Sequence, residues 1–450
     1  MAYFALYSAL SILRHRSYHS FGFDLALYDQ VFWNTTQGRI LESTMTQAIA
    51  YPHSQLGDHF TPIYLALVPF YFVYPHPETL LVIQTFALAL GAWPVYLLAK
   101  AKLRPGFAVM WVLVYLIFVP LAYINLYDFH ETALSVAPLG FALYFLERGK
   151  RLWFVVFLLI TFLVKEEMAL VGAGFGLYVL IGKRDWKLGF SVLIGSLATF
   201  EVIIQVAIPY FAGGHAFPYI ADRYADVGGS PIGVLRTVVT NPLRIVREVA
   251  QTKKLEFVIA LFGPVIGLSA VAGWAGILVL PTLSYSLLSS YEPQFAFSSQ
   301  YSAPLIPLII GTSIIGLSRL PVRAQSAAMA LVLVSALAFS WAYGYMPYSR
   351  KFDPGLFETQ SRYASFVPAL TQIPSDARVS AENGLPPHLD HRRYIYDFGF
   401  EGVQDADWVV LDYEGTNYNI EAFNEQVATV ESKGYVEVAA GYGLALLRKS

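Results

Sequence analysis

Residues 152–182 read LWFVVFLLITFLVKEEMALVGAGFGLYVLIG, two apolar runs interrupted by the charged triplet 165–167. A helix that crosses a bilayer needs about 20 predominantly apolar residues, and ionisable groups inside such a helix are costly. We therefore interpret the stretch as two membrane spans, 152–164 and 166–182, with the triplet at a membrane surface or in a polar cavity. This pattern predicts a polytopic membrane protein.

Further apolar runs occur on both sides of this stretch. They predict a mostly α fold, a transmembrane helical bundle of about 11 spans. The run at 2–13 is short for a full crossing, and the apolar segment 59–74 is interpreted as an interfacial or re-entrant helix. The other predicted spans are 79–99, 106–124, 132–146, 188–209, 257–272, 274–290, 301–318 and 326–345.

The overall composition excludes several classes of protein. Apolar residues make up 56% of the 450-residue chain and charged residues 14%, against about 25% charged residues in soluble proteins. An ordinary soluble enzyme, a disordered chain and a fibrous chain are therefore excluded. The formal net charge of −2 indicates no nucleic-acid partner. Since the chain has no cysteine, disulfides, thiolate metal sites and thiol nucleophiles are also excluded.

Charged residues are concentrated near the C-terminus. The last 104 residues hold 24 of them and the first 346 hold 38. This difference predicts a transmembrane domain at 1–346, with its first external loop at 15–78, and a soluble α/β domain at 347–450. Basic residues favour cytoplasmic loops, which places the C-terminal domain outside an inner or plasma membrane. The basic clusters assigned to the inside are 100–104, 148–151, 183–187 and 319–323.

Short alternating apolar runs in the C-terminal segment predict a small layered α/β core. Helices are expected at 355–371 and 419–433. Candidate acceptor or metal contacts there are Asp376, Glu382, His388, Asp390 and His391, although loop and strand-end positions explain them more simply. The predicted strands are near 379–382, 393–396, 407–412, 434–438 and 443–447.

Under this topology, polar groups gather at the outer membrane face, where ionisable residues mark functional sites by default. Asp24 could cap a short helix, or it could serve as a general base or metal ligand. Lys165 could face a lipid phosphate or lie in a simple loop, and Arg223 could clamp a phosphate or stabilise a loop. The groups are Asp24 with Asp29, Asp58 with His59, Asp128 with His130 and Glu131, the triplet Lys165-Glu166-Glu167, and Arg223-Tyr224 with Gln300-Tyr301.

Several of these motifs together resemble a family of predicted bacterial and archaeal membrane proteins that is placed with the GT-C superfamily of membrane glycosyltransferases. The resemblance covers most of the chain. The motifs are FDLALYDQVFWN at 23–34, DHFTP at 58–62, DFHE at 128–131, KEE at 165–167, RY at 223–224 with GGS at 228–230, and QYSA at 300–303.

The resemblance implies a shared plan and roles for individual residues. A multi-span bundle uses a polyprenyl-phosphate-linked sugar, an acidic residue in the first external loop is catalytic, and a second acidic site follows in a later loop. Asp24 matches the first position, and Asp128 or Glu131 the second. A divalent ion (Mg²⁺, Mn²⁺ or Zn²⁺) could bind through Asp24, His59, Asp128, His130 and Glu131. The expected substrate-binding residues are His59, His130, Lys165, Glu166, Arg223, Tyr224, Gln300 and Tyr301.

The sequence thus predicts a membrane glycosyltransferase that moves a sugar to an acceptor (a glycan, a lipid or a protein) on the outer face. The alternatives are a transporter or flippase for lipid-linked sugars, or a scaffold subunit that retains the GT-C fold. Transporters commonly show inverted repeats with broken helices. No such repeat is seen in the sequence, and the charges gather at one face, which favours an enzyme.

Overall fold

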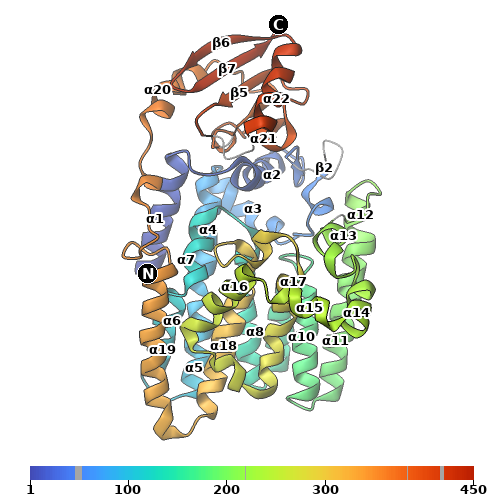
Figure 1. The fold of residues 1–450 in the computed structure, drawn as a ribbon, viewed down its shortest axis with the longest axis vertical. Helices are drawn as coiled ribbons and strands as arrows, with labels where there is room; N and C mark the ends of the chain where they lie inside the picture. Colours follow the sequence, from blue (N-terminus) through green and yellow to red (C-terminus); the bar gives the residue numbers. More distant parts are fainter. Residues whose placement is uncertain (46–52, 218, 383, 416–419) are drawn as a thin grey trace.

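The computed structural model describes residues 1–45, 53–217, 219–382, 384–415 and 420–450. Figure 1 shows a tall helical body, α1 to α19, with the C-terminal unit (residues 361–450, from α20 onward) at one end. The helices of the body are α1 (Ala2–Arg16), α2 (Leu27–Thr36), α3 (Tyr64–Val73), α4 (Pro77–Leu90), α5 (Ala92–Lys102), α6 (Phe107–Leu116), α7 (Val119–Tyr127), α8 (Val136–Glu147), α9 (Arg151–Phe162), α10 (Met168–Ile181), α11 (Trp186–Val202), α12 (Ile208–Phe211), α13 (Tyr219–Arg223), α14 (Pro231–Thr240), α15 (Pro242–Val249), α16 (Thr252–Phe262), α17 (Leu280–Leu288), α18 (Leu305–Arg319) and α19 (Val322–Tyr343).

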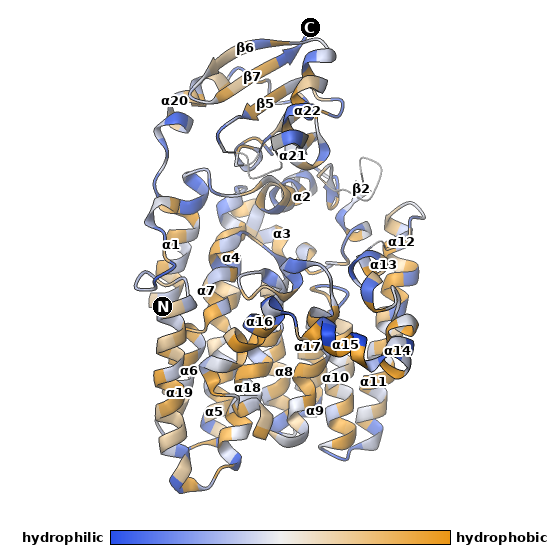
Figure 2. Cartoon of the chain, viewed as in Figure 1, coloured by the Kyte–Doolittle hydropathy of each residue, from blue (hydrophilic) through white to orange (hydrophobic). Residues whose placement is uncertain are grey.

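Within the described parts of the chain, four helical stretches are long and apolar enough to cross a membrane. The pair α6 and α7 is either a fifth, broken span or a re-entrant loop; the two helices are bent by 45°, and Pro120 stands at the start of α7. Apolar residues colour most of this body in Figure 2. The other apolar helices, such as α9 and α10, are shorter, so the predicted count of 11 spans stays a prediction. The four long stretches are Pro77–Lys102, Trp186–Phe211, Gln300–Arg319 and Val322–Tyr343.

The helix at 300–319 lies at the centre of the body, since 94% of its apolar window is buried. The outer helix α19 has only 22% of its window buried, as a lipid-facing helix should. The interior is therefore organised around α18, and the loop that precedes α18 reaches the centre of the bundle.

The predicted span 257–272 is not a continuous helix, whereas Gly273–Leu288, close to the predicted span 274–290, is one helical stretch that begins as a 3₁₀ helix and continues as α17. α16 ends at Phe262, and short 3₁₀ turns occupy most of the chain up to Val279. Pro264 lies in the first turn, and Gly267 and Gly273 adopt positive φ angles of 65° and 61° that favour glycine. These residues interrupt the helical hydrogen bonds within an apolar stretch, which hydropathy alone does not reveal.

The C-terminal unit contains a five-stranded sheet with the order β4-β3-β5-β7-β6. β4, β3 and β5 are parallel to one another, and β7 runs antiparallel to β5 and β6. Its strands are β3 (Val379–Ala381), β4 (Ile395–Asp397), β5 (Trp408–Asp412), β6 (Tyr435–Gly441) and β7 (Leu444–Lys449), and its helices are α20 (Ser361–Leu370), α21 (Phe398–Glu401) and α22 (Ile420–Ser432).

Successive side chains of the central strand β5 point to opposite faces of the sheet. Trp408 and Val410 pack in one apolar cluster with residues of α20. Val409 and Leu411 pack in a second cluster with α22. The unit therefore has three layers, close to the predicted elements; residue 419, where the predicted second helix begins, lies outside the described residues.

The C-terminal unit is joined to the first loop of the body through its edge strand β4. The Thr44 hydroxyl donates to the Ile395 carbonyl (2.7 Å) and accepts from the Ile395 N–H (3.1 Å). Gln30, in α2, donates its side-chain amide to the carbonyls of Arg392 and Arg393 (3.3 and 2.9 Å). The first loop thus provides hydrogen-bond partners for backbone N–H and carbonyl groups that would otherwise be unpaired at the edge of the sheet.

Candidate functional site

Asp24 lies in a single π-helical turn, Gly22–Ala26, that leads into α2. Its carboxylate caps neither this turn nor α2, so the capping interpretation is wrong. Instead, Asp24 Oδ1 lies 3.0 Å from His130 Nε2, with side-chain exposures of 20% and 4%. π turns often occur at functional sites, and this one presents a partly exposed carboxylate that is oriented by an imidazole.

Asp128 is held by the first helix. Its carboxylate pairs with Arg14 (2.7 Å) and accepts the backbone N–H of Phe21 (3.0 Å). Burial raises the pKa of Asp128 to about 6, although Arg14 opposes the rise. The Arg14 and Phe21 contacts tie Asp128 to the end of α1 and to the segment that leads into Asp24.

Lys165 and Glu131 form a buried ion pair. Their Nζ and Oε1 atoms are 2.7 Å apart, and the side chains are 5% and 1% exposed. The Tyr64 hydroxyl donates to the other Glu131 oxygen (3.1 Å). Burial alone would raise the pKa of Glu131, but Lys165 and nearby imidazoles hold it well below its usual range. Both groups are therefore charged, and they link the 128–131 motif to the 165–167 motif.

Glu166 pairs with His59. Its carboxylate lies 2.8 Å from His59 Nδ1 and accepts the backbone N–H of Phe60 (3.1 Å). The His59 ring stacks on Tyr219, with centroids 5.3 Å apart, and Tyr219 in turn donates to Asp58. Two loops far apart in sequence thus meet beside α13.

Arg223 lies among three tyrosine rings. Its guanidinium carbon is 4.6 Å from the Tyr219 centroid, 4.5 Å from that of Tyr291 and 5.6 Å from that of Tyr301. Lys165 Nζ is 5.5 Å from the same Tyr301 ring. Two cations therefore approach one aromatic side chain, and the guanidinium makes no ion pair among the described residues.

The other two predicted binding residues have local partners. Tyr224 donates to the Tyr285 carbonyl (3.1 Å) and accepts from Gln294 (2.9 Å). The Gln300 side-chain oxygen accepts from Ser299 (2.7 Å), and its carbonyl accepts from Thr132 (3.2 Å). Gln300 thus orders the loop before α18.

A cavity of about 490 Å³ opens beside these groups. On α10, Leu170, Ala173, Gly174 and Leu177 line it, the spacing of one helix face. This apolar wall runs for about 10 Å along the helix, from Leu170 to Leu177. The predicted residues among its lining are His59, Lys165, Glu166, Arg223, Tyr224 and Tyr301. Its lining does not include Asp24, Asp128, His130, Glu131 or Gln300, which connect to it through the Glu131–Lys165 pair and the Tyr301 loop.

Residues 14–446 match the family described as "Predicted membrane protein (DUF2079)". The chain belongs to this family. No curated protein sequence matches it.

Among solved structures, this DUF2079 protein resembles ArnT from Cupriavidus metallidurans bound to undecaprenyl phosphate (TM-score 0.58, 13% identity, covering 99% of this chain and 98% of that chain). The apo state of the same protein gives TM-score 0.58 and 13% identity over 99% and 97% of the two chains. An oligosaccharyltransferase from Archaeoglobus fulgidus gives TM-score 0.47 and 14% identity over 100% and 74%. The predicted family of membrane proteins is therefore confirmed, and the fold of the chain resembles that of ArnT.

The cavity wall also contains polar residues that were not predicted to bind, among them Glu167, Tyr219 and Gln294. Glu167 has a buried Oε1 without a hydrogen-bond partner among the described residues. Burial, reinforced by Glu166, raises the pKa of Glu167 to about 7 in spite of Lys165. The charged triplet 165–167, which interrupts an apolar stretch, could have identified Glu167 from the sequence. No local sequence pattern indicates Tyr219 or Gln294.

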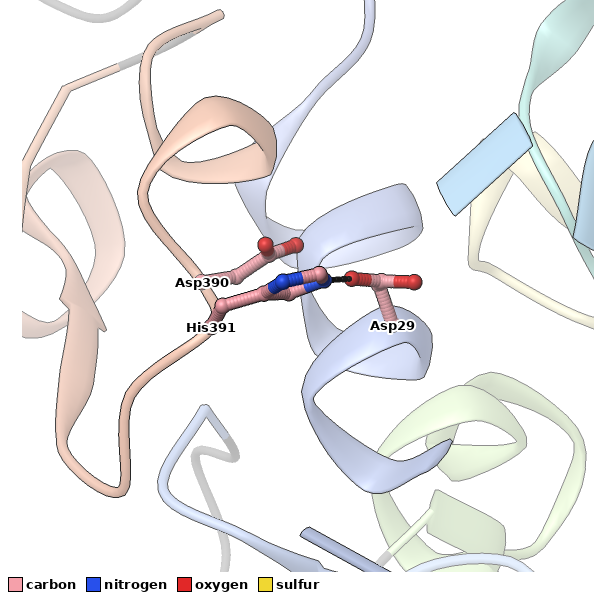
Figure 3. Close-up of side chains that lie close together, drawn as sticks. All are labelled: Asp29, Asp390 and His391. Atoms are coloured by element: carbon pink, nitrogen blue, oxygen red, sulfur yellow. Dashed lines mark hydrogen bonds and ion pairs between the residues drawn. The ribbon is translucent and has the colours of Figure 1, made fainter. Parts of the chain in front are cut away.

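The predicted metal ligands of this DUF2079 protein are distributed among several partners. Asp24 and His130 offer two atoms 3.0 Å apart, a spacing that fits neighbouring ligands of one ion. Asp128, Glu131 and His59 instead pair with Arg14, Lys165 and Glu166. A group of three His or acidic side chains that could hold a metal ion does occur among the described residues. It consists of Asp29, Asp390 and His391, whose ligand atoms lie within 4.8 Å of one another (Figure 3).

The other candidates in the C-terminal unit lie elsewhere. His388 stacks on His15 and Tyr18, with centroids 4.5 and 4.0 Å apart. Asp376 is exposed, and a Glu382 oxygen accepts the Asp412 N–H (3.3 Å). These three positions are explained by packing, exposure and strand-end hydrogen bonding.

Proposed function

We propose that this protein is a glycosyltransferase of the GT-C type, which moves a sugar from a polyprenyl-phosphate donor to an acceptor on the extracytoplasmic face of the plasma or inner membrane. The C-terminal unit then lies on that face, where the acceptor (a glycan, a lipid or a protein) arrives. The observation that carries the proposal is the cavity that joins Lys165 and Arg223 to an apolar helix face. The two cations would bind the negatively charged phosphate of the donor, and the apolar helix face would bind its polyprenyl chain. ArnT, which has the same fold, binds undecaprenyl phosphate.

The reaction joins the acceptor oxygen to the anomeric carbon and breaks the bond from that carbon to the phosphate oxygen. Asp24 accepts the acceptor proton as general base, and His130 orients its carboxylate through the 3.0 Å contact. The phosphate leaves with the electron pair, and its negative charge is stabilised by Lys165 and Arg223. Attack from the face opposite the leaving group inverts the anomeric centre.

A divalent ion bound at Asp24 and His130 would supply additional charge stabilisation. Glu131 keeps Lys165 charged and in position, and Glu166 does the same for His59. Tyr224 and Gln300 stabilise the loops that carry Arg223 and Tyr301.

Arg223→Gln should weaken the binding of undecaprenyl phosphate by about 10- to 100-fold, because it removes a charged donor to the phosphate. The measurement is a titration of full-length protein in nanodiscs with undecaprenyl phosphate as the probe. Arg244→Gln serves as the matched control, since Arg244 is exposed on α15. Equal affinity in the Arg223→Gln variant and the native protein would contradict the proposal. In a separate assay with the protein in lipid vesicles, movement of the intact lipid-linked sugar across the bilayer without sugar transfer would favour a flippase instead.

The affinity for undecaprenyl phosphate should also fall as the pH rises through about 7, the pKa of Glu167. Below that pH the Glu167 carboxyl is neutral, and above it a negative charge in the cavity opposes the phosphate, by roughly tenfold in affinity. The Glu167→Gln variant lacks this charge. Ionisation of the lipid phosphate itself affects both proteins equally, so the difference between their pH profiles, measured by the same titration, isolates Glu167. Parallel profiles would exclude its carboxylate from the phosphate environment.

A further inference from the structure

Asp29, Asp390 and His391 meet where the helical body joins the C-terminal unit. Asp29 belongs to α2, one turn beyond the segment that carries Asp24. Asp390 and His391 follow the short turn Pro386–His388. Figure 3 shows the three side chains pointing toward one another from these two parts of the chain. The cluster exists only because the C-terminal unit docks on α2.

The two carboxylates are buried, and among the described residues neither pairs with a Lys or Arg; the one ion-pair partner is the His391 imidazole. Asp29 is 0% exposed and Asp390 is 2% exposed. The nearby Arg392 donates instead to the carbonyls of Pro374 and Ala377 (3.1 and 3.0 Å). Burying two carboxylates together without a counter-charge is strongly unfavourable. A bound cation would therefore stabilise this cluster.

The hydrogen bonds of the cluster leave one ligand atom free. Asp29 accepts from the Tyr71 hydroxyl (2.7 Å), and its other oxygen lies 2.9 Å from His391 Nε2. Asp390 Oδ2 has no hydrogen-bond partner among the described residues. An unpartnered oxygen on a buried carboxylate, beside a second carboxylate and an imidazole, is the arrangement that a metal ion completes.

We propose that Asp29, Asp390 and His391 bind a zinc-class divalent ion that fastens the C-terminal unit to α2. Ligand atoms around Zn²⁺ lie about 3 to 3.5 Å from one another, given bonds near 2 Å in tetrahedral geometry, and the 2.9 Å between Asp29 Oδ2 and His391 Nε2 is only slightly shorter. The imidazole favours Zn²⁺ over Mg²⁺ or Ca²⁺. The His391 side chain is 39% exposed, which provides an entry path and room for water as the fourth ligand.

The site lies outside the 490 Å³ cavity, so the experiment requires no sugar substrate. Full-length protein in detergent is stripped with a chelator and dialysed against Zn²⁺ alone, and bound zinc and melting temperature are measured. The variants are Asp390→Asn and His391→Gln, which preserve size, and the matched control is Asp376→Asn, an exposed carboxylate of the same unit.

The native protein and the control should each bind about one more zinc ion per chain than either variant, and only these two should melt at a higher temperature with Zn²⁺. Equal zinc content in all four proteins would overturn the proposal, because zinc would then bind elsewhere. An Asp390→Asn variant that is as stable as the zinc-loaded native protein would also overturn it, since a shared proton would then suffice to hold the carboxyl pair.

Discussion

Replacing Asp24 with Asn should reduce glycosyl transfer by at least about 10²- to 10⁴-fold, the contribution of a general base. The amide keeps the shape of the carboxylate and still offers an oxygen to His130, whose Nε2 is 3.0 Å away, but it cannot take the acceptor proton. Lipid-phosphate binding should be nearly unchanged, because Asp24 does not line the cavity. The measurement is the release of undecaprenyl phosphate from undecaprenyl-phosphate-linked sugars.

The matched control for this experiment is Asp226→Asn, which changes an exposed carboxylate between α13 and α14. It should retain full activity. Melting temperature and undecaprenyl phosphate binding verify that the Asp24 variant is folded. Full transferase activity in that variant would remove Asp24 from the mechanism and leave the cavity as a binding site only.

Replacing Lys165 with Met should destabilise the protein by about 3 to 5 kcal/mol, because it leaves the buried Glu131 carboxylate without its partner. The double variant Glu131→Gln with Lys165→Met removes both charges and should regain most of that stability. Transfer activity should stay low in both variants, because neither can stabilise the leaving phosphate through Lys165. Thermal or chemical unfolding in detergent and the release assay measure the two effects separately.

Lys253→Met is the control for this pair of variants. Lys253 and Glu292 form an exposed ion pair, with side chains 65% and 60% exposed, worth at most about 1 kcal/mol. If the double variant regained activity together with stability, Lys165 would be a structural residue and Arg223 would be the remaining cation for the phosphate.

The broad architecture could be predicted from the sequence because it depends on local patterns. Apolar runs located the long helices, and alternating residues in the C-terminal segment located strands such as β5, whose neighbours pack on opposite faces. The predicted span 257–272 was misinterpreted because hydropathy measures apolar content and not the continuity of a helix. There Pro264 and the left-handed Gly267 break the helix.

The candidate site could be predicted as a set of residues but not as a set of contacts. The sequence singled out Lys165 and Glu131, yet nothing local indicates that they pair, since 34 residues separate them. Asp24 was compatible with a helix cap, and the tertiary contact with His130 replaced that local option. The Asp29–His391 contact joins residues 362 apart, and only the docking of the C-terminal unit creates it.

The contact between Thr44 and β4 has a consequence for synthesis of the chain. Thr44 and Ile395 are separated by 351 residues, and ribosomes add about 5 to 20 residues per second. The first loop must therefore wait roughly 20 to 70 s for its partner, while most of the bundle is inserted into the bilayer. During that interval the polar groups of the loop must form hydrogen bonds with water or with a chaperone. Once β4 has been synthesised, its unpaired edge can pair with another nascent chain until it binds the loop.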